Sequence, residues 1–272
     1  MAYRTSSLFH YTSDINVLKS ILEEGLFPNY CKEIFPSQDQ CMTIGIPMIS
    51  FCDIPIKETS LFRERYGDYA IGLDKEWGIR NGINPILYVS NENIFNSASL
   101  VESYKRILQD ENTKNGGDDQ TITFSLSPGP LDEVTTFLRM QQMKYASLYI
   151  LGFLKPYYIE RNGKLQCNYE ENEWRYIVLE NDRIPWWWNE QVYSEWRGTG
   201  YKPYPTDEMK KTGLRFEPKN IKWILTPDDE SAHEMIEHIM NSPTVCGYEL
   251  NDMVKCLICG KIKSFASIEQ DI

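Results

Sequence analysis

The stretch YEENEWRYIVLE, residues 169–180, combines four glutamates and an arginine with the apolar spacing of a strand. Read at a period of two, one side carries Glu171, Glu173 and Arg175, and the other carries Asn172, Trp174, Tyr176 and Val178. The second set is what a half-buried strand offers a core. The charged set either is solvated or lines a cleft.

Glu173 is the strongest candidate for chemistry in this stretch. A carboxylate in mid-strand is unfavourable unless an interaction compensates it. The alternative is an exposed Glu–Arg ladder, which contributes at most about 1 kcal/mol. We expect the cleft, with Glu173 and Arg175 pointing inward between the strand of His10 and the strand of Ser50. Glu173 should then be mostly buried, near His10, and hydrogen-bonded to another strand.

His10 and Ser50 are polar residues in apolar strands. His10, one of three histidines, ends SLFHYT just ahead of a helix start, and Ser50 lies in IPMISFCDIP. Sites tend to be built at such junctions of strands with helices or loops. The alternatives are a core histidine bonded to the backbone and a serine that caps a strand end.

The cysteines give one metal-like spacing, Cys256-Leu257-Ile258-Cys259. A structural zinc site needs four ligands and usually a second pair. Cys246, His233 and His238 are available as further ligands, but a single CxxC beside apolar residues is more often packing. The sequence therefore predicts no bound metal at Cys256 and Cys259.

Composition limits the class of protein. The chain has 272 residues, of which 42% are hydrophobic, and this suits one domain with insertions. No run of about 18 apolar residues occurs and the start lacks a secretion signal, so a cytoplasmic location without a membrane is expected. A net charge of −11 argues against a general nucleic-acid binder. Nucleic acid is expected only as a transient substrate, and a protein as the lasting partner.

The apolar patterns predict a single α+β domain over 1–272 with a mixed sheet. Strands are expected near 6–11, 48–52, 69–73, 85–90, 173–179 and 221–225. A helix is expected from Ser13 or Asp14 to Gly25, where the cap and the glycine mark its ends. A helical insertion should occupy about 91–157, and a loop-rich insert about 182–212. A wholly helical protein or a doubly wound parallel sheet would contradict this pattern.

Five segments in order, LFHYTSDINVLKSILEEGLFPNYC, IPMISFCDIPI, RYGDYAIGLDKEWGIRNGINPILYV, YEENEWRY and IKWILTP, resemble the AbiGi-type abortive-infection proteins of bacterial phage defence. A wider similarity, through the His-x-Thr strand and the late Glu-Trp-Arg strand, is to the ADP-ribosyltransferase fold. That resemblance implies a split mixed sheet with a cleft that can hold NAD as a substrate.

The resemblance also implies roles for individual residues. Glu173 and His10 would be the catalytic residues. The cofactor-binding residues would be His10 and Thr12 on a ribose, Ser50, Tyr66 on nicotinamide, and Arg175 on phosphate. Glu171, two positions before Glu173, is not matched to a motif position.

Three functions remain open at this stage. The first is an NAD-dependent ADP-ribosyltransferase that acts on a phage or host macromolecule. The second is a non-catalytic, antitoxin-like defence protein that binds a partner protein or a phage component through the same fold. The third is a zinc-stabilised regulatory protein.

Overall fold

A computed structural model describes residues 5–35, 42–90, 146, 149–161, 163–179, 183–184, 186 and 206–270. Its centre is an eight-stranded sheet in the order β14-β11-β4-β1-β3-β10-β5, with β2 paired to β3. The strands are β1 (Ser7–Thr12), β2 (Asn29–Phe35), β3 (Met42–Cys52), β4 (Tyr69–Asp74), β5 (Asn84–Pro85), β10 (Glu173–Ile177), β11 (Ile221–Thr226) and β14 (Ile262–Ser264). Neighbouring strands are antiparallel except for β11 and β14.

The sheet opens between β1 and β3. These two strands pair only at Phe9 and Cys52, whereas β1 pairs with β4 over its whole length. The long strand β3 also changes partners, because residues up to Met48 pair with β2 and residues from Met48 onward pair with β10. The sheet is therefore continuous through β3, but the backbones of β1 and β3 separate beyond their one paired position.

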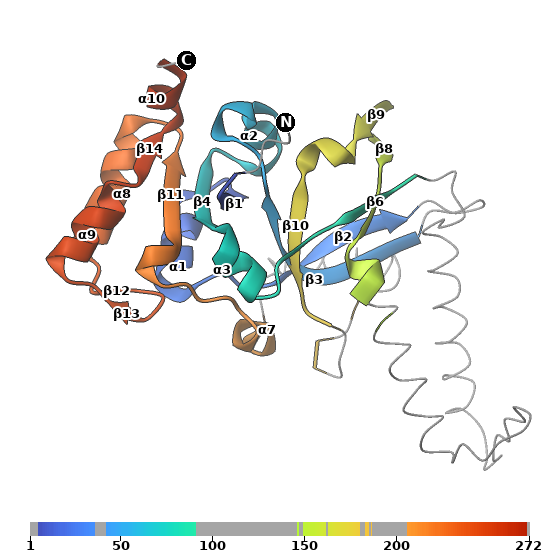
Figure 1. Cartoon of the computed structure of the whole chain (residues 1–272), viewed down its shortest axis with the longest axis horizontal. Coiled ribbons are helices and arrows are strands. Elements are labelled where there is room, and N and C mark those ends of the chain that lie inside the picture. Colours follow the sequence, from blue (N-terminus) through green and yellow to red (C-terminus); the bar gives the residue numbers. More distant parts are fainter. Residues whose placement is uncertain are drawn as a thin grey trace, which may run out of the picture.

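Helices cover both faces of the sheet (Figure 1). One apolar core joins Leu8, Ile71 and Ile224 to the helices α1 (Ile15–Glu24), α3 (Lys75–Arg80), α8 (Asp229–Asn241) and α9 (Asp252–Cys259). On the other face, Phe9 and Leu225 pack with residues of α2 (Ser60–Tyr66) and α10 (Phe265–Gln270). Alternate residues of one strand thus enter different cores, as the period of a strand requires.

Helix α1 has the ends that its sequence predicts. Asp14 caps it by accepting a hydrogen bond from the Asn16 backbone N–H at 2.8 Å. Gly25 ends it at a φ of 104°, and a Cβ there would lie 2.6 Å from the Leu214 carbonyl oxygen. A glycine is required at this position because the backbone of the neighbouring segment leaves no room.

Smaller elements lie around the central sheet. They are the parallel pair β6 (Leu87–Val89) and β7 (Leu154–Pro156), the hairpins β8 (Tyr158–Arg161) with β9 (Lys164–Cys167) and β12 (Thr244–Val245) with β13 (Tyr248–Glu249), the helix α7 (Asp207–Lys211), and the 3₁₀ turns η1 (Ile56–Glu58), η2 (Asn168–Glu171) and η3 (Pro218–Asn220). None of the helices in the described part of the chain has the length and apolar character needed to cross a bilayer.

The mixed α+β architecture predicted from the sequence is confirmed, and five of the six predicted strands lie in the central sheet. The strand predicted near 85–90 is instead two short ones, of which only β5 joins that sheet. The strand predicted to begin at Met48 begins at Met42. Residues 154–156, expected in the helical insertion, form strand β7. Most of the insertions expected at 91–157 and 182–212 lies outside the described residues.

Candidate functional site

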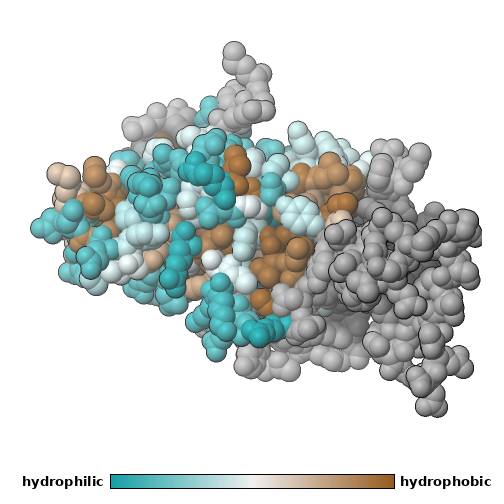
Figure 2. All heavy atoms as spheres, turned by 60° about the horizontal axis from the view of Figure 1, so that its bottom comes forward, coloured by the Kyte–Doolittle hydropathy of each residue, from teal (hydrophilic) through white to brown (hydrophobic). Residues whose placement is uncertain are grey.

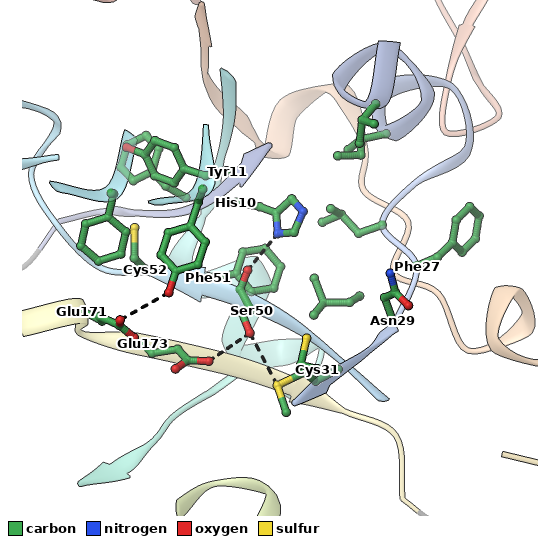
Figure 3. A pocket seen from close by; sticks show the side chains of 18 of the residues that line it. His10, Tyr11, Phe27, Asn29, Cys31, Ser50, Phe51, Cys52, Glu171 and Glu173 are labelled. Carbon is green, nitrogen blue, oxygen red and sulfur yellow. Dashed lines mark hydrogen bonds between the residues drawn. The ribbon is translucent and has the colours of Figure 1, made fainter. Parts of the chain in front are cut away.

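A pocket of about 930 Å³ lies where the sheet opens between β1 and β3. Its walls come from these two strands, from α1 and α2, and from the beginning of β2, and Glu171 and Glu173 lie at its floor. The volume is within the range of pockets that hold a cofactor or another small molecule. Aromatic and polar side chains both line it (Figure 3).

His10 crosses the gap between the two strands. Its Nδ1 lies 2.8 Å from the Ser50 carbonyl oxygen on β3, at a point where β1 and β3 no longer pair through their backbones. A carbonyl oxygen only accepts, so Nδ1 carries the hydrogen and Nε2 of the neutral ring is an acceptor. Burial lowers the pKa of His10, which keeps the ring neutral. His10 is therefore a fixed, uncharged part of the pocket wall.

Ser50 and Glu173 are joined directly across neighbouring strands. The Ser50 hydroxyl donates to Glu173 Oε1 at 3.0 Å, and the Glu173 residue is 8% exposed (Figure 3). The prediction of a buried glutamate bonded to another strand is confirmed. Its predicted position needs correction, because the strand order β1-β3-β10 places Glu173 beyond the Ser50 strand instead of between it and β1.

Glu173 belongs to a buried network of five charged side chains. Arg175 donates through Nε to Glu173 Oε1 at 2.6 Å and through Nη2 to Oε2 at 3.1 Å. Lys155 Nζ donates to Glu173 Oε2 at 2.7 Å. With Ser50, these contacts give the two Glu173 oxygens four donors, which matches the acceptor capacity of a carboxylate.

The network extends from Glu173 in two directions. Lys155 Nζ also donates to Glu171 Oε2 at 2.6 Å. Arg175 Nη2 donates to Glu33 Oε1 on β2 at 2.6 Å, and its Nη1 donates to the Gly152 carbonyl at 2.9 Å. Three carboxylates thus share two buried cations, and Arg65 on α2, whose side chain is 30% exposed, reaches Glu171 Oε1 at 3.1 Å.

The pKa directions follow from burial opposed by these partners. Burial would raise the pKa of Glu173, but Arg175 and Lys155 outweigh it and hold that pKa well below its usual range. For Lys155, Glu173 and Glu33 outweigh burial and raise its pKa. Burial raises the pKa of Glu33 because its share of cation contacts is smaller. Glu173 is therefore ionised throughout the neutral range.

Of the remaining candidates from the sequence, Tyr66 lines the pocket and Thr12 and Arg175 do not. Tyr66 lines the pocket, is 41% exposed, and donates from its hydroxyl to Glu171 Oε1 at 3.3 Å. Thr12 is not among the lining residues and pairs with Tyr69 at the end of β1. Arg175 is fully buried behind Glu173, with its nitrogens used by protein groups, so the phosphate contact expected for it does not fit this arrangement.

The charged face of β10 is directed inward, as expected. Glu173 and Arg175 lie on its more buried side, whereas Trp174 and Tyr176 are only partly buried. Glu171 is in the 3₁₀ turn η2 before the strand, and Asn172 separates the two with a left-handed φ of 40°. The charges of this segment therefore form part of the interior. Trp186 is buried in a separate apolar cluster and does not line the pocket.

The sequence did not single out Lys155 or Glu33. Lys155 lies in the apolar run GFLKPY, where one lysine among hydrophobic residues is the signal that could have drawn attention to it. Glu33 lies in NYCKEIF, whose alternation is that of a strand. In both cases the partner is distant in the sequence, so spacing alone could not identify the contact.

The cysteine pair lies away from the pocket. Cys256 and Cys259 are one helical turn apart on α9, with Cys256 exposed and Cys259 partly buried. Within the described ranges, no group of three or more His, Cys, Asp or Glu side chains could hold a metal ion. The absence of zinc at this pair remains a prediction.

Fold and pocket together define the class, a mixed α+β protein with a ligand-sized pocket above a buried charge network. The family model described as "Putative abortive phage resistance protein AbiGi, antitoxin" matches residues 24–227. The chain is also 28% identical over 239 residues to the abortive phage resistance protein AbiGi of Lactococcus lactis subsp. cremoris, across 83% of this chain and 88% of that protein. The chain belongs to the AbiGi family of abortive phage resistance proteins and is thus a phage-defence component.

No solved structure matches the chain. The similarity to ADP-ribosyltransferases is therefore not shown by these comparisons and rests on the sequence motifs alone.

Proposed function

We propose that this phage-defence component binds NAD in the pocket and transfers ADP-ribose from it to a macromolecule. The observation that carries the proposal is that His10, Ser50 and Glu173, from three neighbouring strands, line one pocket of about 930 Å³. Such a pocket is large enough for a dinucleotide. The three residues are among the six that the resemblance assigns to NAD, and Tyr66 also lines the pocket.

In this proposal Glu173 acts on the ribose attached to nicotinamide. The bond between the anomeric carbon and the nicotinamide nitrogen breaks, nicotinamide leaves with the bonding pair, and the ribose becomes an oxocarbenium ion that the acceptor nucleophile attacks. An ionised carboxylate fixed near the developing positive charge lowers the barrier electrostatically. Arg175 would hold Glu173 in place from behind, and Tyr66 would offer a ring to nicotinamide at the rim.

A ligand must displace a group that now bonds Glu173. Its oxygens already accept from Ser50, Lys155 and Arg175. The Ser50 hydroxyl is the neutral donor among these, and removing it leaves no unpaired charge. A ribose hydroxyl would therefore take the place of Ser50 on Oε1.

NAD binding and cleavage by the purified chain test the proposal. We expect calorimetric binding of NAD to the wild type and release of nicotinamide, detected by chromatography. Glu173→Gln should retain binding within a few fold and lose nicotinamide release. Asp53→Asn is a matched control, since Asp53 is another largely buried carboxylate paired with a lysine, at 2.5 Å from Lys75, and does not line the pocket. Absence of NAD binding by the wild type would overturn the proposal.

A second candidate is an antitoxin-like protein that restrains a partner protein without catalysis. It is favoured by the word antitoxin in the matching family description and by the full occupation of Glu173 by protein donors. Apolar areas also lie among polar ones on the surface seen in Figure 2, and Met253 and Leu165 are more than 70% exposed.

If the protein is antitoxin-like, Glu173→Gln would leave phage protection intact, and protection would need a second protein. Full protection by this chain alone would exclude a required partner protein.

A further inference from the structure

Lys155 is the cation at which the pocket and the buried network meet. Its Nζ lies 2.6 Å from Glu171 Oε2 and 2.7 Å from Glu173 Oε2. It lines the large pocket, whereas Arg175 does not. It also lines a second pocket of about 310 Å³ behind the first, together with Lys32 and Glu33. Lys155 thus bonds both carboxylates at the pocket floor.

Lys155 reaches this position from the segment that precedes the hairpin of β8 and β9. Strand β7, which carries it, pairs with β6 outside the central sheet. Three residues earlier, Gly152 supplies the carbonyl that accepts from Arg175 Nη1 at 2.9 Å. One short segment, residues 152–155, therefore contacts the network at both of its cations.

We propose that Lys155 is a positioning residue of this site, which bridges Glu171 and Glu173 so that Glu173 stays charged and directed at the pocket. The inference rests on the proposed function in one respect only, namely that Glu173 acts on NAD. The bridge itself follows from the geometry, because two carboxylates held against one ammonium would repel each other without it.

The charge count gives the expected effect of removing Lys155. Three carboxylates share Lys155 and Arg175, so Lys155→Met leaves three carboxylates against one buried cation. The groups that face Lys155 and Glu173 are Glu33 and Cys31 on β2, Cys52 on β3, Arg65 and Tyr66 on α2, Tyr88 on β6, Glu171 on η2 and Arg175 on β10. Among these, Arg175 and Arg65 are the cations, and both already bond carboxylates.

Without Lys155, the pKa of Glu173 should therefore rise toward its usual range, and the pKa of Glu33, which burial already raises, should rise further because Lys155 is one of the two cations that lower it. A carboxyl such as Glu33, whose folded-state pKa lies above its unfolded value, contributes stability at low pH and loses it as the pH rises. The melting temperature of Lys155→Met should thus fall further below that of the wild type between about pH 5 and pH 7. NAD cleavage, if the wild type performs it, should be lost on the acid side at a higher pH in Lys155→Met than in the wild type, because Glu173 is protonated more readily there.

A second substitution separates charge from packing. Lys155→Met with Glu171→Gln restores the original excess of one carboxylate over the buried cations. The double variant should recover the wild-type dependence of melting temperature on pH, as should Lys155→Arg, which keeps the charge. Lys75→Met is the matched control, since Lys75 pairs with the single carboxylate of Asp53 at 2.5 Å.

Thermal melting from pH 4 to pH 8 decides the matter. The proposal is supported if the melting temperature of Lys155→Met falls further below that of the wild type as the pH rises, and if the double variant removes this difference. The proposal is overturned if the difference in melting temperature is constant with pH, or if the double variant has the same dependence on pH as Lys155→Met. If Lys155→Met does not fold, a double variant that also fails to fold overturns it. If the wild type does not bind NAD, the proposed function fails while the melting curves still test the role of Lys155.

Discussion

Arg175 Nη2 lies 2.6 Å from Glu33 Oε1, and this ion pair joins β10 to β2 across the inner strand β3. Both side chains are buried, Arg175 completely. The pair links two strands that bond stretches of β3 which meet at Met48, since Glu33 lies opposite Ile44 and Arg175 opposite Ser50. It therefore holds together the part of the sheet in which the pocket is formed.

Replacing Arg175 with Met should destabilise the protein strongly. The substitution leaves the buried carboxylates of Glu173 and Glu33 without their shared partner. Breaking a buried ion pair on one side costs about 3–5 kcal/mol of unfolding free energy. Urea denaturation followed by circular dichroism measures the loss. Lys211→Met, which removes an exposed partner of Glu208, is the control and should change little. A loss for Arg175→Met as small as that of the control would show that the network is not structurally required.

Glu173→Gln should also lower stability, which differs from the small effect expected for an isolated strand glutamate. Gln keeps two hydrogen-bonding groups, but its NH₂ cannot accept from Arg175 or Lys155, and the negative charge is lost. Hydrogen bonds to charged groups contribute about 1.5–3 kcal/mol each, so we expect a loss of roughly 2 kcal/mol. The unfolding free energy must therefore be measured beside any activity. An unchanged urea midpoint would mean that Ser50 and the cations rearrange around the amide.

His10 should make stability fall on mild acidification. Its pKa is lowered in the folded state because the ring is buried, whereas the unfolded chain has the ordinary value near 6.5. A histidine whose folded pKa is depressed contributes stability above the unfolded pKa and loses it as the pH falls. The melting temperature of the wild type should therefore drop between about pH 7.5 and pH 5.5 by more than that of His10→Gln. His233→Gln, with a side chain 73% exposed, should behave as the wild type. Equal falls in melting temperature for all three proteins would show that His10 does not cause the loss of stability on acidification.

Gly152→Ala should disturb the segment that carries Lys155. A Cβ on Gly152 would lie 2.5 Å from Ile177 Cδ1 on β10, so the buried Ile177 side chain has to change its conformation or the segment has to move. Overpacking of this kind costs about 1–3 kcal/mol, and a shift of the segment would also move the carbonyl that Arg175 bonds. Gly260→Ala is the control, because its Cβ meets only atoms at 3.6 Å and its φ of −63° suits alanine. Denaturation midpoints compare the two, and equal midpoints would show that Ile177 yields without cost.

The Cys256 and Cys259 pair should bind no zinc. Both thiols project from one short helix, which can offer two ligands of the four that a structural site needs. Elemental analysis of the purified protein should give well below one equivalent of zinc. One equivalent that Cys256→Ser abolishes would contradict the prediction.

The sequence predicts local features of this fold well and distant ones poorly. The cap at Asp14 and the stop at Gly25 depend on neighbouring residues, and both are found as expected. The strands of His10, Ser50 and Glu173 were recognised from alternation and apolar runs. The strand predicted near 85–90 divides because Trp174 pairs with Pro85 while Leu87 pairs with Leu154, and such a choice of partners is not encoded in local spacing.

The candidate site shows the same division. The charge row at Glu173 was visible as an anomaly and was expected to face inward, but the sequence could not show how its buried charges are balanced. That depends on Lys155 and Glu33, whose side chains neutralise the row from segments 18 and 142 residues away from their partners. Arg175 was assigned to phosphate because the motif places it beside Glu173, whereas its burial directs it to Glu33 and Gly152 instead.

The sequence separation within the network has a consequence for the order of folding. Glu33 and Arg175 are 142 positions apart, and Ser50 and Glu173 are 123 apart. Contacts of such long range close late, because the chain must first lose the entropy of a large loop. A nascent chain whose Arg175 has not yet emerged from the ribosome already has His10 and Ser50. It lacks the floor of the pocket and the charge network below it. We therefore expect the site to form late in folding, when β10 docks on β3.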